Sequence, residues 1–259
     1  MKIVVLVKQV PDTWGERTLR ADGTVDRESA DSVIDEITER AVETALQLRE
    51  AHQGTVTVLT MGPVGAVDVL RKALAMGADS AILVTDDALA GSDALQTSAA
   101  LAAALRTVEF DLVIAGTEST DGATGAIPAM LAERLGLAQL TFLSAVTVEG
   151  DVVSGNRSVE DGSLEVRAHL PAVISMTEQA PDPRFPNFRG IMGAKKKPLT
   201  KLSAADLGLN PDDIGGANAW SLVRGVTARP PRSAGTVIKD DGTGATQLAD
   251  FLASANLLK

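Results

Sequence analysis

Apolar runs alternate with amphipathic stretches over the first half of the chain. Residues 2–10, KIVVLVKQV, are dense in β-branched side chains, which is typical of a buried parallel strand. In residues 35–52 the apolar positions recur every three to four residues, which predicts a helix with one buried face. The same patterns predict further strands at 55–62, 81–85 and 110–116, and further helices at 66–80, 92–108 and 126–136.

The alternation of strands and helices defines the fold class. It predicts an α/β protein with a mostly parallel sheet, helices on both faces and right-handed crossovers. Two residues are expected to mark helix ends. Gly77 is placed to end the second helix in the αL conformation, and Ser92 to cap the third.

The pattern changes after Gly136. Four apolar segments joined by Gly and Asp turns predict an antiparallel addition to the sheet; they are residues 140–150, 151–161, 163–171 and 172–178. Residues 179–201 have several prolines and no helical period, so a long loop is expected there, and such a loop is usually functional or disordered. The last sixty residues indicate an arm with little core of its own, closed by a short helix at 246–258.

One loop has the chemistry of a phosphate cradle. Residues 116–130, GTESTDGATGAIPAM, are rich in glycine and in hydroxyl side chains, and they connect the end of a predicted strand to a helix. The loop holds no lysine or arginine, which argues against transfer of a γ-phosphate. Glu118 and Asp121 would repel a phosphate unless they face a ribose or cap the turn. A plain capped turn is an equally good reading of the loop taken alone.

Two other strand ends are expected at the same edge of the sheet. Leu6 and Lys8 end the first strand, and Met61 and Gly62 end the second. Together with Ile37 they could enclose an adenine ring, although each is individually compatible with ordinary core packing.

Composition narrows the function classes. The chain has 259 residues, of which 45% are apolar, and its 24 basic and 34 acidic residues give a net charge of −10. This charge argues against a nucleic-acid or anionic-membrane binder. There is no cysteine, and the two histidines, His52 and His169, lie far apart, so no thiolate or imidazole metal cluster is expected. No segment reaches the roughly 20 apolar residues of a membrane span, and no signal-type cleavage site is seen, so a cytoplasmic protein is expected.

The sequence assembles no complete catalytic constellation. A Ser-His-Asp arrangement lacks the G-x-S-x-G elbow that would support it. This pattern favours a carrier or binding subunit over an enzyme that acts alone.

A local inversion of charge marks the proline-rich segment. Six basic residues and no acidic residue lie between Arg184 and Lys201, and apolar side chains accompany them. Apolar anchors ringed by cations are typical of a site that docks an acidic protein partner. A solvated lysine run and an RNA-contacting loop are the alternatives.

The same segment carries a family resemblance. DPRFPNFRGIMGAKKKPL, residues 182–199, resembles the signature of the β subunit of electron transfer flavoprotein. Residues 1–13, 73–79 and 156–173 also agree with that family, in the same order. The resemblance implies a Rossmann-like fold of the adenine nucleotide α-hydrolase type. It also implies a nucleotide-binding domain over residues 1–201, with a partner-docking loop at 181–199, and a C-terminal arm over 202–259 that packs on a partner subunit.

The resemblance further implies a function. The β subunit would pair with an α subunit that holds most of an FAD, cover part of that flavin and bind one AMP in a structural role. It would dock acyl-CoA-type dehydrogenases as electron donors, and a membrane quinone oxidoreductase would accept the electrons. A second FAD in place of AMP, as in bifurcating members, stays open, as does a stand-alone adenine-nucleotide-binding protein.

Positions carried over from the family give the candidate residues. The implied AMP site comprises Leu6, Asp35, Glu36, Ile37, Thr38, Met61, Gly116, Thr117, Glu118, Ser119, Thr120, Asp121, Gly122, Ala123, Thr124, Gly125, Ala126 and Ile127. Arg157 is expected near the flavin. The implied docking residues are Arg184, Phe185, Phe188, Arg189, Ile191, Met192, Lys195, Lys196 and Lys197. The chain departs from the family in having Asp35-Glu36 where an Asn-Pro pair is common, and Phe188 where leucine is common.

Overall fold

The computed structural model describes residues 1–15, 18–227, 230 and 235–258. Contacts within the chain divide it into a large unit, Met1–Arg224, and a small unit, Gly225–Lys259. The large unit includes residues 202–224, which the sequence analysis assigned to the arm. The Gly216 N–H, for example, donates to the Ala90 carbonyl at 2.9 Å. Residues 228, 229, 231–234 and 259 of the predicted arm lie outside the described residues, and packing of the arm on a partner stays a prediction.

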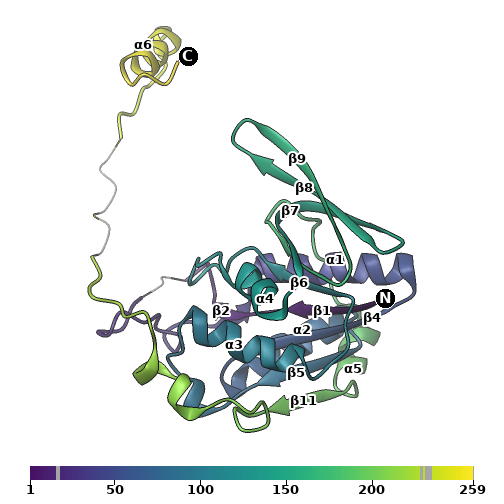
Figure 1. Cartoon of the computed structure of the whole chain (residues 1–259). Coiled ribbons are helices and arrows are strands. Elements are labelled where there is room, and N and C mark those ends of the chain that lie inside the picture. Colours follow the sequence, from purple (N-terminus) through teal and green to yellow (C-terminus); the bar gives the residue numbers. More distant parts are fainter. Residues whose placement is uncertain (16–17, 228–229, 231–234, 259) are drawn as a thin grey trace. The chain divides into compact units, whose positions relative to one another are not determined.

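The large unit is built on one long sheet (Figure 1). The strands are β1 (Lys2–Leu6), β2 (Gln9–Pro11), β3 (Ser32–Ile34), β4 (Thr55–Met61), β5 (Ser80–Val84), β6 (Leu112–Gly116), β7 (Ala138–Glu149), β8 (Val152–Val159), β9 (Gly162–His169), β10 (Ala172–Met176) and β11 (Leu199–Leu202). In the described residues, nine of them form a sheet in the order β11-β5-β4-β1-β6-β10-β7-β8-β9, and β2 pairs with β3 separately. Pairing is parallel from β11 to β7 and antiparallel from β7 to β9. The expected α/β class with an antiparallel addition is confirmed. The assignment of residues 172–178 to that addition was wrong, because they contain β10, which pairs in parallel with both β6 and β7 inside the sheet.

Helices of the large unit cover both faces of the parallel part. They are α1 (Glu36–His52), α2 (Val67–Met76), α3 (Ala94–Leu105) and α4 (Ile127–Leu135), and α5 (Phe188–Ala194) packs against α2. The large unit also has short 3-10 turns, η1 (Val64–Ala66), η2 (Asp87–Leu89), η3 (Pro211–Asp213) and η4 (Gly216–Asn218), and the small unit contains α6 (Gly244–Ser254). Helices α1 and α2 pack on one face, while α3 and α4 pack on the other. Of the helices in the described residues, none is long and apolar enough to cross a membrane.

Strand β1 shows why its sequence is almost continuously apolar. Successive side chains of a strand point to opposite faces, and both faces here are covered. Ile3 and Val5 belong to the core beneath α1 and α2, whereas Val4 and Leu6 belong to the core beneath α3 and α4. All four side chains are buried, so a polar substitution at any of them would disturb one of the two cores.

The segment predicted as one long loop contains a helix and a strand. Helix α5 begins after Asn187, whose side-chain oxygen accepts the N–H of Gly190 at 2.8 Å. A Cβ on Gly190 would lie 2.3 Å from the Ala75 carbonyl oxygen of α2, so only glycine permits this close packing. The strand, β11, then adds to the parallel sheet beside β5. The loop prediction was therefore wrong for these residues, because α5 is too short to show a helical period and forms against α2.

Two predicted helix ends differ in detail. Gly77 follows α2 with φ 146° and ψ −12°, which is a glycine conformation but not the αL conformation expected. The cap of α3 is Asp93 and not Ser92. Asp93 and Gln96 form a capping box, in which the Asp93 carboxylate accepts the Gln96 N–H at 3.0 Å. Ser92 instead accepts the Gly215 N–H through its hydroxyl at 3.1 Å.

Candidate functional site

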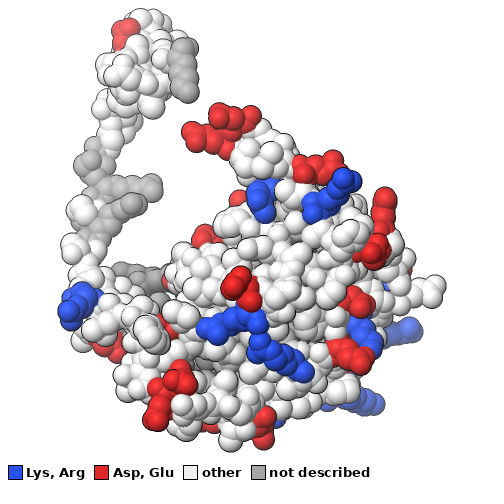
Figure 2. Space-filling model, viewed as in Figure 1, with Lys and Arg blue, Asp and Glu red and all other residues white. Residues whose placement is uncertain are grey.

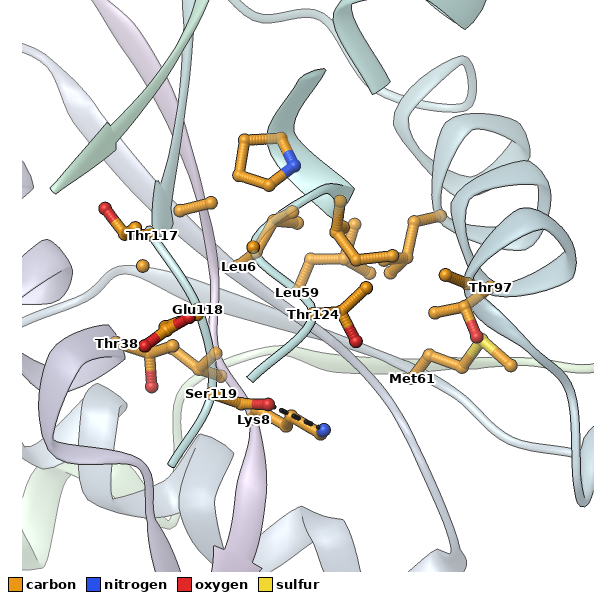
Figure 3. Close-up of a pocket in the computed structure, with 18 of the residues that line it drawn as sticks. Leu6, Lys8, Thr38, Leu59, Met61, Thr97, Thr117, Glu118, Ser119 and Thr124 are labelled. Atoms are coloured by element: carbon orange, nitrogen blue, oxygen red, sulfur yellow. Dashed lines mark hydrogen bonds between the residues drawn. The ribbon is translucent and has the colours of Figure 1, made fainter. Parts of the chain in front are cut away.

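A pocket of about 250 Å³ lies at the carboxyl ends of β1, β4 and β6. Ligands of open parallel sheets bind at such ends, where the connections diverge. Leu6 ends β1, Met61 ends β4 and Gly116 ends β6, so the three strand ends named from the sequence do meet there. Figure 3 shows their surroundings, with several side chains directed into the same space.

The structure separates the predicted AMP residues into two groups. Those that line the pocket are Leu6, Thr38, Met61, Gly116, Thr117, Glu118, Ser119, Thr124, Gly125 and Ile127. Those that lie outside its lining are Asp35, Glu36, Ile37, Thr120, Asp121, Gly122, Ala123 and Ala126. The lining also contains Lys8, which the sequence placed at this edge of the sheet, and residues not expected at the site, among them Leu59, Asp93, Ala94, Thr97 and Leu101. Asp93 to Leu101 come from the start of α3, which follows β5 and therefore opens at the same edge of the sheet.

The pocket has an apolar side and a polar side. Leu6, Leu59 and Met61 form an apolar wall from the sheet. The polar side carries Lys8, Ser119 and hydroxyl groups of the loop after β6, together with the carboxylates of Asp93 and Glu118. A flat apolar group with a polar or anionic tail matches this division.

Asp35 fixes the loop instead of lining the pocket. Its side chain is fully buried, and one carboxylate oxygen caps α1 by accepting the N–H groups of Ile37 (3.0 Å) and Thr38 (3.2 Å). The other oxygen accepts the N–H and the hydroxyl of Thr120 at 2.7 and 2.9 Å. Asp35 therefore ties the loop after β6 to the start of α1.

Gly116 allows the same two segments to approach closely. A Cβ at this position would lie 3.1 Å from the Thr38 methyl group and 3.2 Å from a methyl group of Ile37. Such contacts are tighter than side chains normally accept. A glycine at the end of β6 therefore favours close packing against α1, in addition to any role beside a ligand.

Cations reach the loop from elsewhere in the chain. The Lys8 ammonium donates to Ser119 Oγ at 3.0 Å and to Asp121 Oδ1 at 2.8 Å, and Arg27 pairs with the second oxygen of Asp121. Burial acts to raise the pKa of Asp121, but the hydrogen bond and charge of Lys8, with Ser119 and Arg27, outweigh it and hold that pKa well below its usual range. The acidic side chain that seemed unfavourable for phosphate is thus neutralised, and Lys8 supplies the cation that the loop sequence lacks.

The start of α3 also holds the segment that leads into the arm. The second oxygen of Asp93 accepts the backbone N–H groups of Trp220 (2.8 Å) and Ser221 (3.0 Å). Burial acts to raise the pKa of Asp93, and its backbone hydrogen bonds from Gln96, Ser221 and Trp220 lower it overall. A pocket-lining carboxylate is therefore fully engaged in holding chain segments together.

The predicted docking residues form an exposed apolar group on and beside α5. Phe185 and Phe188 are 95% and 79% exposed, and Ile191 and Met192 are about half exposed. Arg189, Lys195 and Lys196 are also exposed around them. Docking of a partner at these exposed residues stays a prediction.

Arg184 and Lys197 point inward and are not part of that ring. The Arg184 guanidinium pairs with Glu43 at 2.7 Å and Glu50 at 2.5 Å, both on α1. These hydrogen bonds raise the pKa of Arg184 further above its ordinary value. The Lys197 ammonium donates to the carbonyls of Leu74 (2.9 Å) and Ala78 (2.6 Å), and burial lowers its pKa. Both cations therefore bind parts of this chain.

Arg157 lies on β8 and is held against β7. Its Nε–H donates to the Thr141 carbonyl at 2.7 Å. The next residue on β7, Phe142, has a positive φ of 63°, which is unusual for a bulky side chain, and Ser175 accepts its N–H at 2.9 Å. The location of Arg157 near a flavin stays a prediction.

The distribution of charged side chains and of possible metal ligands bears on which ligands the protein could bind. On the face shown in Figure 2, acidic and basic side chains of the described residues are interspersed, with no continuous basic field. Across the part of the chain that the structure describes, no group of three or more His, Cys, Asp or Glu side chains could hold a metal ion.

The fold and the pocket define an open α/β protein with a part-apolar, part-polar site at its strand ends. A family model described as the electron transfer flavoprotein domain matches residues 22–207. The electron transfer flavoprotein subunit beta of Mycobacterium tuberculosis is 52% identical over 263 aligned residues, which cover 99% of each chain. The corresponding subunit of Megasphaera elsdenii is 36% identical, with 96% of each chain covered. The caffeyl-CoA reductase-Etf complex subunit CarD of Acetobacterium woodii is 35% identical, with 98% of this chain and 97% of that protein covered.

The chain belongs to the electron transfer flavoprotein β-subunit family, which confirms the resemblance noted in the sequence. Membership assigns it a role in electron transfer and implies an α-subunit partner.

Proposed function

We propose that this chain and an α subunit form a soluble cytoplasmic electron carrier, in which this chain holds AMP structurally and covers part of an FAD bound mostly by the α subunit. It docks acyl-CoA-type dehydrogenases as donors, and a membrane quinone oxidoreductase accepts the electrons. The pocket at the strand ends is the observation that carries the AMP assignment, because an apolar wall and a polar wall that includes Lys8 meet there.

The residues present suit a mononucleotide. Leu6, Leu59 and Met61 would contact the base, while Lys8 and the loop after β6 would hold the phosphate. The volume of about 250 Å³ lies slightly below the roughly 300–1,000 Å³ of typical ligand pockets. Lys8 lines the pocket, and Lys8 and Arg27 together neutralise Asp121, so the loop presents less negative charge to a bound anion.

The contribution of this chain to electron transfer is binding and orientation. FAD, when bound, supplies the redox chemistry of the complex. Arg157, fixed by its hydrogen bond to Thr141, would present a positive charge at the flavin side of the subunit. The exposed apolar group on α5 would contact the dehydrogenase.

The test is to identify the nucleotides in the intact complex. The chain is purified together with its α subunit, the protein is denatured, and the released nucleotides are separated and quantified. One FAD and one AMP per heterodimer are expected. Two FAD and no AMP would assign the pocket to a second flavin. A chain that binds no flavin with any α subunit, or that hydrolyses ATP alone, would overturn the proposal.

A further inference from the structure

The last lysine of the AKKK run has a different environment from its two neighbours. Lys195 and Lys196 are exposed, whereas the Lys197 ammonium lies against the end of α2. Its two acceptors, the carbonyls of Leu74 and Ala78, belong to the last turn of α2 and the residues after it. Carbonyls at a helix end lack partners within the helix and carry partial negative charge, so an ammonium satisfies them well.

Lys197, which follows α5, donates to the end of α2, and Arg71 of α2 donates in return to the end of α5. This arginine of α2 donates from Nη1 to the carbonyl of Ala194 at 2.6 Å and to that of Lys197 at 3.3 Å. Ala194 is the last residue of α5, so Arg71 satisfies the end of α5 while Lys197 satisfies the end of α2. The two cations therefore cross-link the ends of the two helices.

The packing between the helices leaves little freedom for α5. Gly190 lies so close to α2 that a Cβ would meet the Ala75 carbonyl at 2.3 Å, and Ala194 is buried in the core. On its other side the segment is held to α1 by Arg184, through Glu43. A seven-residue helix is not stable by itself, so these contacts fix its orientation.

We propose that Lys197 and Arg71 are positioning residues that set the orientation of the exposed side chains of α5, so that Lys197 supports docking through geometry and not through its charge. This inference rests on the proposed docking function of α5. If Lys197 acts through geometry, the cations of residues 188–197 that contact the partner are Arg189, Lys195 and Lys196.

Matched lysine substitutions in the intact αβ complex test the inference. Lys197→Met is compared with Lys195→Met and Lys196→Met, which remove the same charge at exposed positions. The first measurement is hydrogen–deuterium exchange of the backbone amides in residues 188–197. Exchange should become faster in Lys197→Met and stay unchanged in the other two variants, and equal exchange in all three would overturn the inference.

The second measurement is the KM for the complex as electron acceptor of a purified acyl-CoA dehydrogenase supplied with its acyl-CoA substrate. The Debye length falls from about 30 Å at 0.01 M salt to about 3 Å at 1 M, so effects of exposed charge disappear at high salt. Lys195→Met should match the wild type at 1 M salt. Lys197→Met should keep a KM raised about tenfold at both salt concentrations with kcat unchanged, as expected for displaced interface anchors. A Lys197→Met defect that vanishes at 1 M salt would overturn the inference.

A second variant covers the case in which Lys197→Met does not fold. Gly190→Ala displaces α5 from α2 without altering any charge, and it should raise the KM independently of salt. An unchanged KM in this variant would contradict control by the orientation of α5. If the wild-type complex accepts no electrons from the dehydrogenase, the docking function itself fails, while the exchange measurement still decides whether Lys197 holds α5.

Discussion

The carboxylate of Asp35 accepts two hydrogen bonds from Thr120, one from its N–H and one from its hydroxyl, although 85 residues separate them in the chain. The same carboxylate caps α1. The start of a helix and the loop beside the pocket are thus held by one buried group, and the shape of the pocket depends on it.

Asp35→Ala should lower the free energy of unfolding by about 2 kcal/mol or more, because it removes a helix cap and leaves a buried N–H unpaired. Urea unfolding of the complex measures the loss. Glu36→Ala is the control, since Glu36 is exposed and should change stability little. Equal losses in the two variants would show that the contact with Thr120 is not important.

Lys8→Met should weaken binding of AMP to the nucleotide-free complex by roughly tenfold or more, the loss expected when a hydrogen bond from a charged donor is removed. Calorimetric titration with AMP gives the affinity. Lys2→Met removes an exposed lysine from the opposite end of β1 and should leave the affinity unchanged. An unaltered affinity in Lys8→Met would remove Lys8 from the site.

Asp121 predicts a pH dependence of stability. Its pKa in the folded chain lies well below the ordinary 3.8, so its ion pairs stabilise the fold above about pH 4, and that stabilisation is lost as the pH falls through the lowered pKa. Asp121→Asn should therefore be less stable than the wild type by roughly 1–2 kcal/mol at neutral pH, with the difference shrinking below pH 3.8. Unfolding curves recorded across this range test the sign. Glu118→Gln removes an exposed negative charge from the same loop and serves as the control.

Phe188→Ala should raise the KM for reduction by an acyl-CoA-type dehydrogenase about tenfold and leave the flavin spectrum unchanged, because the side chain is 79% exposed beside the docking cations. Stopped-flow or steady-state reduction of the complex measures the effect. Leu95→Ala removes an exposed apolar side chain from α3 and serves as the control. Loss of flavin in Phe188→Ala would show that Phe188 supports the fold and does not dock.

Strongly periodic segments were predictable from the sequence, and short segments that depend on tertiary contacts were not. The sequence of β1 predicts a strand with helices on both sides, because the side chains on both of its faces are apolar. Helix α5 and strand β11 are too short to show a period, and each forms by packing against another element, α2 for the helix and β5 for the strand. Proline and lysine in their sequences favour a loop unless those neighbours are known.

Those parts of the site that local sequence patterns mark could be predicted, and the parts that depend on tertiary contacts could not. The loop after β6 could be recognised from its glycine and hydroxyl residues, and Lys8 could be expected at the same edge of the sheet. The hydrogen bond from Lys8 to Ser119, 111 positions further on, could not be predicted. The two meet only because β1 and β6 are neighbours in the sheet. The lining from α3 depends likewise on strand order, which no local pattern reveals. Arg184 and Lys197 looked like docking cations because composition shows charge and not direction.

Strand β9 ends the long sheet, and of the strands that the structure describes none pairs with its outer side. An eight-residue strand with a free edge is a template on which another extended chain can add. Two of its residues, Glu165 and Arg167, are charged, and natural edge strands use charged side chains to keep other copies of the chain from adding there.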